Sequence, residues 1–100
     1  MEVKFGNTRL KRCYETHKDA VRAWGPKIAR RYVDRVNRLS AAASAQDLMG
    51  FPELRLHPLK GDRQGEWSIV LDGAYRLIVV FENEKMTIVR VEEVSDHYGD

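Results

Sequence analysis

Residues 67–81 read WSIVLDGAYRLIVVF. In the first half of this stretch, apolar side chains recur at every second position from Trp67 to Leu71, as they do on a strand with one buried face. Asp72-Gly73 follows directly and is a strong hairpin signal, because both residues tolerate the positive φ angles of a tight turn. The second half is rich in aromatic and β-branched residues, which favour strands. The stretch therefore predicts an antiparallel hairpin.

Two further strands and a long connection are predicted around this hairpin. Residues 83–85 turn the chain, and residues 86–94 hold enough β-branched side chains to supply a third strand. Residues 3–5 predict a short first strand, and residues 50–65 predict a long connection. The C-terminal half is thus expected to form a meander of three antiparallel strands.

Helices are predicted ahead of the meander. A short helix is expected near residues 8–14, and helix formers at residues 19–23 predict another, which Gly25 ends. Pro26 suits the first position of a new helix. The apolar residues of that helix recur every three or four positions: Ile28, Tyr32, Val36, Leu39 and Ala43. The alanine-rich residues 41–45 are expected to continue it.

Helices first and hairpin-linked strands afterwards predict an α+β fold, in which the N-terminal helices pack on one face of a small antiparallel sheet. A length of 100 residues suits a single domain over residues 1–100. Cys13 is the only cysteine, which excludes a disulfide framework and a cysteine-rich zinc site. The longest apolar run, residues 77–81, is far shorter than the roughly 20 residues of a membrane helix. We therefore expect no membrane contact and a cytoplasmic location.

Positive charge is concentrated in the N-terminal part of the chain. Residues 1–40 hold 11 Lys and Arg against 4 Asp and Glu, whereas residues 41–100 hold 6 against 11. A basic surface of this kind attracts phosphate groups or an acidic protein partner. The plain alternative is a solvated face of an amphipathic helix.

Signatures of metal and nucleotide sites are missing from the sequence. His17, His57 and His97 are scattered, and no histidine or carboxylate pair has the spacing of metal ligands. The glycines at 61 and 65 precede a predicted strand and not a helix, unlike a phosphate-binding loop. We therefore predict neither a metal ion nor a cofactor.

Three places carry side chains that could meet in one cleft: the loop with His57, Lys60 and Arg63, the strand residue Arg76, and the C-terminal Asp96, His97 and Tyr98. Cleavage of RNA by its own 2′-hydroxyl needs a base, cations for the crowded phosphate and an acid for the leaving oxygen. Arginine suits the phosphate because its guanidinium binds two oxygens at once. Each place also has a structural interpretation: a solvated turn, a strand cation facing water, and a frayed terminus.

Four motifs follow one another in the second half: LKGDR at 59–63, GEWSI at 65–69, YRL at 75–77 and VEEVSDHY at 91–98. In this order they resemble the HigB-like, or killer protein, branch of the RelE/ParE superfamily of bacterial toxins. The N-terminal half resembles that branch only in its layout. The resemblance implies a RelE-like toxin of a type II toxin–antitoxin system. Such a toxin cleaves mRNA at codons in the ribosomal A site without a metal ion, and so inhibits translation and growth.

The resemblance also implies roles for individual residues. Catalytic roles fall on Lys60, Arg63, Arg76, Asp96, His97 and Tyr98. RNA binding falls on the basic helix and the loop, through Lys27, Arg30, Arg31, Arg35, Arg38 and His57. The C-terminal order departs from the branch, because many of its members end in Asp-Tyr-His. On a continuing strand, Asp96 and Tyr98 would share one face and His97 would lie on the other.

The resemblance further implies the partners of the chain. RelE-like toxins rely on the ribosome to position the message, so mRNA and ribosomal RNA are expected partners. A HigA-like antitoxin with its own helix-turn-helix would silence the toxin, and the toxin would contact DNA only through it.

Two other functions remain open at this stage. A ParE-like toxin acts on DNA gyrase and needs no nuclease site, so alanine at Arg76, His97 or Tyr98 would leave it toxic. A nuclease-inactive module that binds only its antitoxin or nucleic acid would not need the C-terminal residues. The sequence shows no pair of helices with the short turn of a helix-turn-helix, which argues against direct DNA recognition.

Overall fold

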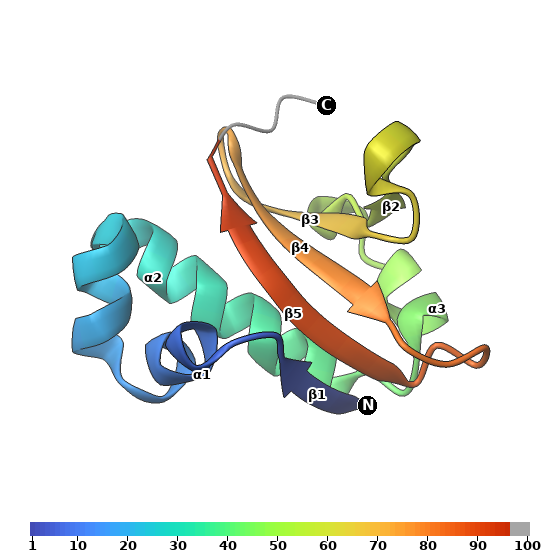
Figure 1. Cartoon of the computed structure of the whole chain (residues 1–100), viewed down its shortest axis with the longest axis horizontal. Helices are drawn as coiled ribbons and strands as arrows, with labels where there is room; N and C mark the ends of the chain where they lie inside the picture. The colour runs from blue at the N-terminus through green and yellow to red at the C-terminus, as the bar shows by residue number, and fades with distance from the viewer. Residues whose placement is uncertain (97–100) are drawn as a thin grey trace.

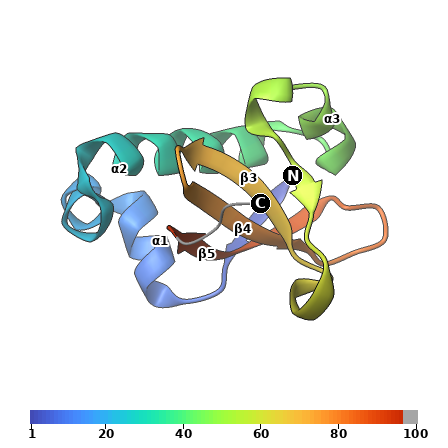
Figure 2. The ribbon, with the colours of Figure 1, turned by 90° about the horizontal axis from the view of Figure 1, so that it is seen from above.

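The computed structural model of the chain describes residues 1–96. The chain forms, in order, β1 (Glu2–Phe5), α1 (Thr8–Glu15), α2 (His17–Ala41), α3 (Ala45–Met49), the 3-10 turn η1 (Pro52–Leu54), β2 (His57–Pro58), the 3-10 turn η2 (Gly61–Arg63), β3 (Trp67–Asp72), β4 (Tyr75–Phe81) and β5 (Ile88–Ser95). The strands form a five-stranded sheet in the order β1-β5-β4-β3-β2 (Figure 1). Seen from above, α2 runs along one side of this sheet and η2 projects on the other (Figure 2). The predicted α+β class is confirmed.

The sheet is mixed, which corrects the expectation of a purely antiparallel one. The pairs from β2 to β5 are antiparallel, whereas β1 lies parallel to β5, with Glu2 beside Ile88 and Phe5 beside Val91. A strand next to its partner in sequence is joined by a hairpin and must run antiparallel. β1 and β5 are separated by most of the sequence. No short turn therefore fixes the direction in which β1 pairs with β5.

The predicted hairpin between β3 and β4 is confirmed. Gly73 has a φ of 55°, in the left-handed region that glycine occupies without strain. Asp72 pairs with Tyr75 across the turn, and a β-bulge lies between Val70 and Asp72 on β3. The hairpin places Arg76 on the second residue of β4.

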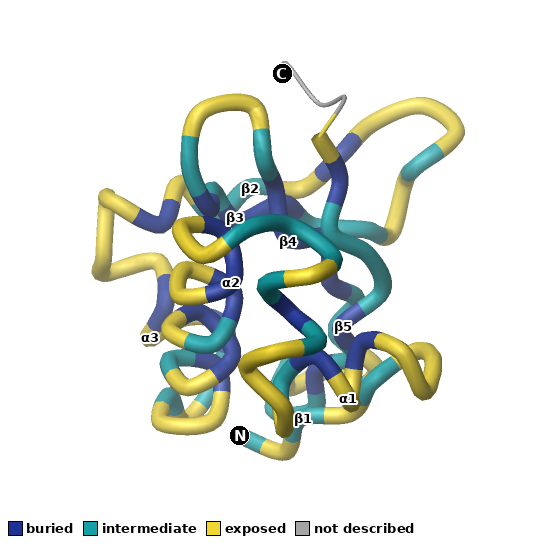
Figure 3. Tube along the Cα trace, turned by 90° about the vertical axis from the view of Figure 1, so that its left-hand side faces the viewer, coloured by how far each residue is buried: buried dark blue, intermediate teal, exposed yellow. Residues whose placement is uncertain are grey.

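The core lies between α2 and the inner face of the sheet. The large fully buried side chains of α2 are Tyr32, Val36 and Leu39, and those of the inner sheet face include Ile69, Leu71, Leu77, Val79, Val89 and Val91. Figure 3 shows the buried parts of the chain gathered between these elements and the exposed turns on the outside. The periodic residues that predicted the helix are thus the residues that pack, except Ala43, which is exposed beyond the helix end.

Tyr32 connects α2 to α1 through a buried hydrogen bond. Its hydroxyl donates to the carbonyl of Leu10 at 2.7 Å, and its ring contacts Trp24. Burial raises the pKa of Tyr32, so the hydroxyl stays protonated and remains a donor.

Replacing Tyr32 with phenylalanine is expected to lower the free energy of unfolding by about 1 kcal/mol, because the hydrogen bond is lost and the ring packing is kept. Urea denaturation measures this change. Tyr14→Phe is the matched control, since the Tyr14 hydroxyl bonds Asn37 at an exposed position. An equal loss of stability in both variants would contradict the account.

The break predicted in the helical region is confirmed at Gly25. Gly25 has a φ of 83°, so α2 consists of two helical segments, and Pro26 begins the second one. No helix within residues 1–96 is long and apolar enough to cross a membrane.

The helix does not continue through residues 41–45, contrary to the prediction from their alanine content. It ends at Ala41, and α3 begins at Ala45, whose N–H donates to the Met86 carbonyl at 3.0 Å. The amino group of Met1 bonds the Ser40 carbonyl at 2.9 Å, so contacts with β1 and with the β4–β5 turn replace further helical bonds. Tertiary contacts here outweigh helix propensity.

The connection at residues 50–65 is more ordered than predicted, because it contains β2. This strand pairs His57 with Ser68 and Pro58 with Trp67. Two residues that include a proline are too short to give a strand signal in the sequence. The other turn, at residues 83–85, is confirmed: the Asn83 side chain accepts from the N–H of Thr87 at 2.9 Å.

Candidate active site

The outer face of the sheet, opposite α2, carries two rows of side chains that cross the strands. Partners in register on antiparallel strands point to the same side. One row therefore runs from β2 to β5 through His57, Ser68, Ile78 and Glu93. The next row holds Val70, Arg76 and Ser95, two residues or about 7 Å further along the strands.

Arg76 lies in the second row, beside the last residue of β5. Only 8% of its surface is exposed, so the interpretation of Arg76 as a strand cation facing water is wrong. Its guanidinium donates to the carbonyl of Tyr75 at 3.1 Å and to that of Gly73. These bonds hold the side chain over the β3–β4 turn, at the end of the sheet from which the chain continues to Asp96.

Arg63 reaches the first row from η2. Its guanidinium donates to Glu66 at 2.6 Å and to Glu93 of β5 at 2.5 Å. The hydrogen bonds to Glu66 and to Glu93 raise the pKa of Arg63, so its charge is fixed. The loop that was predicted to enter the sheet is thus tied across the outer face to β5. Arg63 and Arg76 consequently stand over adjacent rows of the same face.

His57 and Ser68 lie opposite each other in the first row. The Nδ1 atom of His57 is 2.8 Å from the carbonyl of Arg55, which places the ring proton on Nδ1. Ser68 is fully buried, and within residues 1–96 its hydroxyl has no hydrogen-bond partner. A buried hydroxyl without a partner is unusual and marks a site under functional constraint or strain.

The remaining predicted catalytic residues lie around this face or outside the described part of the chain. Lys60 is exposed at the start of η2, and Asp96 is exposed directly after β5. The predictions for His97 and Tyr98 fall outside the described residues. Within residues 1–96, no three His, Cys, Asp or Glu side chains gather as they would around a metal ion.

The basic helix face is largely occupied by internal ion pairs. Lys27 pairs with Asp72 at 3.1 Å, and Arg38 pairs with Glu53 at 3.1 Å. Arg30 and Arg31 are exposed. The Arg38 guanidinium also lies over the ring of Phe51, 5.4 Å from its centre. Lys27 and Arg38 are therefore partly neutralised by carboxylates although they remain in contact with solvent, whereas Arg30 and Arg31 are exposed.

Arg35 is the clearest departure from the predicted RNA-binding set. It is 7% exposed, and its Nε atom donates to the Val70 carbonyl at 3.1 Å, where the bulge interrupts the β3 ladder. A second bond joins it to Asp34 at 2.5 Å. Arg35 therefore fastens α2 to the sheet and does not face RNA.

Replacing Arg35 with alanine is expected to lower the free energy of unfolding by about 1–3 kcal/mol, because the buried Val70 carbonyl loses its partner. Arg31→Ala, on the exposed side of the same helix, is expected to change it by less than about 0.5 kcal/mol. Chemical denaturation of both variants checks this difference. Equal effects would place Arg35 outside the helix–sheet contact.

Sequence reasoning missed the partners of Arg63. Glu66 stands three residues after Arg63, a spacing that could have indicated the pair. Glu93 gave no such signal, because a bulge between Ile78 and Val79 shifts the register of β5 and turns Glu93 to the outer face. Ser68 could have been found as the polar residue that alternates with Trp67 and Ile69.

Comparison with known proteins identifies the family to which this chain belongs. The family described as "RelE-like toxin of type II toxin-antitoxin system HigB" matches residues 3–93. The chain belongs to this family of HigB toxins. The earlier resemblance is thereby confirmed, and the HigB-like toxin has an antitoxin as its partner.

One curated protein is similar to this HigB-like toxin in sequence, and two solved structures are similar to it in fold. Endoribonuclease HigB of Proteus vulgaris is 39% identical over 64 residues, which cover 61% of this chain and 70% of that protein. The YoeB/ParE toxin from Agrobacterium tumefaciens superposes with a TM-score of 0.59 at 19% identity, over 98% of this chain and all of that one. A chain of the YoeB-YefM complex from Staphylococcus aureus superposes with a TM-score of 0.62 at 11% identity, over 98% of this chain and 98% of that one. The two structures share the fold of the HigB-like toxin.

Proposed function

We propose that this HigB-like toxin is a ribosome-dependent endoribonuclease that cleaves mRNA without a metal ion and thereby inhibits translation and growth. The observation that carries the proposal is the placement of two guanidinium groups, Arg63 and Arg76, on adjacent rows of the outer sheet face. The name of the Proteus vulgaris relative, an endoribonuclease, supports the same activity. The proposal treats residues 1–100 as a single toxin domain.

The proposed reaction begins with attack of a 2′-hydroxyl on the adjacent phosphate. A base takes the proton of that hydroxyl, a cyclic phosphate forms, and the 5′-oxygen leaves with a proton from an acid. The phosphate gains negative charge in the transition state, which preorganised cations stabilise. Arg76 and Arg63 suit this role because their positions are already fixed by hydrogen bonds, and Lys60 adds a third cation at the rim.

Proton transfer is assigned to groups beside these arginines. Asp96 follows Ser95, which lies opposite Arg76, so the backbone of Asp96 continues from the row that holds this arginine. We assign the remaining proton-transfer roles to His97 and Tyr98. His57 contributes to RNA binding from the first row, where the Arg55 carbonyl orients its ring.

The partners proposed for the toxin follow from the same reaction. Positioning by a large partner can supply a substantial part of a rate enhancement, about 7–11 kcal/mol at best. We therefore propose mRNA in the ribosomal A site as the substrate and ribosomal RNA as a binding partner. A HigA-like helix-turn-helix antitoxin would silence the toxin and connect it to DNA, and both would act in the cytoplasm.

A cleavage assay with purified components tests this function. A 5′-labelled message is incubated with the toxin in chelator-free buffer, with and without translating ribosomes, and supercoiling by DNA gyrase is followed in parallel. The proposal predicts cuts in the message only with ribosomes, and unchanged supercoiling. An intact message with inhibited gyrase would establish a ParE-like function, and no effect on either would leave a binding-only protein.

A further inference from the structure

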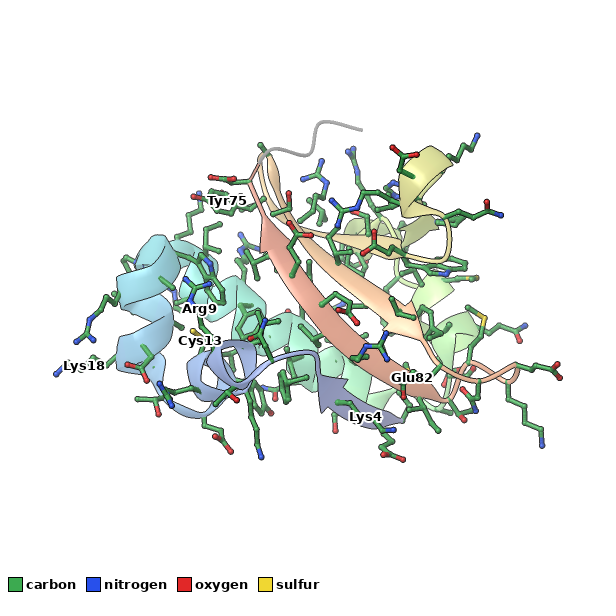
Figure 4. All side chains as sticks on the ribbon, viewed as in Figure 1. Lys4, Arg9, Cys13, Lys18, Tyr75 and Glu82 are labelled. Carbon is green, nitrogen blue, oxygen red and sulfur yellow. The ribbon has the colours of Figure 1, made fainter. Side chains whose placement is uncertain are left out.

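A hollow of about 380 Å³ between α1 and the first segment of α2 is lined by three arginines. Arg9 and Arg12 stand one turn apart on α1, and Arg22 comes from α2. Asp19 is the only carboxylate of the lining, so the hollow carries a net positive charge. Figure 4 shows Arg9 where the two helices meet, and Lys18 pointing away from them.

Within the described part of the chain, the three arginines of the hollow are not neutralised by ion pairs. No ion pair is found for Arg9, Arg12 or Arg22 anywhere in residues 1–96, whereas Lys27 and Arg38 on the second segment of α2 are both paired. Arg9 is held in place by the ring of Trp24, 5.8 Å from its guanidinium carbon. Arg30 and Arg31 on the second segment of α2 are also exposed, but Arg9, Arg12 and Arg22 line a common hollow.

Cys13 is part of the lining of the hollow. Cys13 is buried there, and burial raises the pKa of its thiol. Arg9 and Arg12 act against that rise, while Asp19 adds to it. Cys13 therefore lines the hollow together with the two arginines and Asp19.

We propose that this arginine hollow binds the phosphodiester backbone of a structured RNA, as a contact separate from the outer face of the sheet. The choice of RNA rests on the proposed function, and under that function the RNA is ribosomal. Guanidinium groups bind phosphate oxygens in pairs, and an RNA backbone offers a phosphate at every nucleotide.

The surroundings of the hollow favour RNA over a protein partner. Protein interfaces have an apolar centre, whereas nucleic-acid interfaces are polar and positively charged. The exposed large apolar side chains of residues 1–96 are Met49 and Phe51, at α3 and just after it, beyond the opposite end of α2. The arginine hollow therefore lies apart from the exposed large apolar side chains that a protein partner would cover.

Charge reversal in the hollow tests the assignment. Arg12→Glu and Arg22→Glu are compared with Lys85→Glu, an equal charge change in the exposed β4–β5 turn. All three are made in an Arg76→Ala background, so that RNA cleavage is slow during the experiment, and binding to purified small ribosomal subunits is measured over a range of salt. We expect each hollow variant to bind about tenfold more weakly, with a salt slope reduced by about one or more. Lys85→Glu is expected to bind like its parent, and Arg12→Lys to retain most of the affinity.

The outcomes separate this inference from the proposed function. Hollow variants that bind the subunits as tightly as Lys85→Glu would overturn the assignment. Variants that bind the subunits normally but fail to capture the antitoxin would also overturn the assignment. They would show that the hollow contacts a protein partner. If the hollow variants lose RNA affinity but the wild-type toxin cuts no message, the assignment stands and the nuclease function fails.

Discussion

Replacing Arg76 with alanine is expected to slow cleavage of ribosome-bound mRNA by about 100- to 1,000-fold, because a preorganised donor to the phosphate is lost. The variant should also lose about 1–3 kcal/mol of stability, since Arg76 is buried and satisfies the carbonyls of Gly73 and Tyr75. Single-turnover cleavage is therefore measured well below the melting temperature of the variant.

Arg76→Lys separates catalysis from folding at this position. Lysine keeps the positive charge but cannot bind two phosphate oxygens as a planar fork. We expect a rate between those of the wild type and the alanine variant, with stability closer to the wild type. A folded Arg76→Ala protein that cleaves at the wild-type rate would remove Arg76 from the site.

Replacing Arg63 with methionine is expected to reduce cleavage by about 100-fold, for two reasons that act together. The phosphate loses a cation, and Glu66 and Glu93 lose the charge that now neutralises them. Two free carboxylates on the outer face would then repel the message. Cleavage rates at saturating ribosome concentration measure the loss.

Glu93→Gln is the matched variant for Arg63. It leaves the Arg63 charge and the Glu66 pair in place and removes one negative charge from the face. We expect a rate within about fivefold of the wild type, because a partly exposed ion pair is worth little. A loss as large as that of Arg63→Met would mean that Glu93 itself takes part in the reaction.

The sequence predicted the elements of this fold better than their pairing. The hairpin at Asp72-Gly73 and the break at Gly25 were predictable because each depends on the backbone conformation of a local glycine. The parallel pairing of β1 and the strand β2 were not, because each depends on residues far away in the chain. The end of α2 at Ala41 was missed for the same reason.

The candidate site was predictable in its residue types but not in its contacts. Arg63 and Arg76 stood out as cations beside apolar strands, and the structure brings both to one face. The burial of Arg76 and the pairing of Arg63 with Glu93 depend on strand register, which a single bulge changes. Arg35 was assigned to RNA together with the other cations of the basic helix, because the sequence does not show which strand carbonyl a helix side chain meets.

Cleavage of a message with one altered nucleotide tests the central claim most directly. The cut site is first mapped by primer extension on ribosome-bound mRNA, and the nucleotide on its 5′ side is then replaced by its 2′-deoxy form. The account predicts that the cut at that position disappears, because the attacking 2′-hydroxyl is gone, while cuts at unaltered codons persist. Continued cleavage at the deoxy position would show that the 2′-hydroxyl is not the nucleophile and would contradict the mechanism assigned to the arginine site.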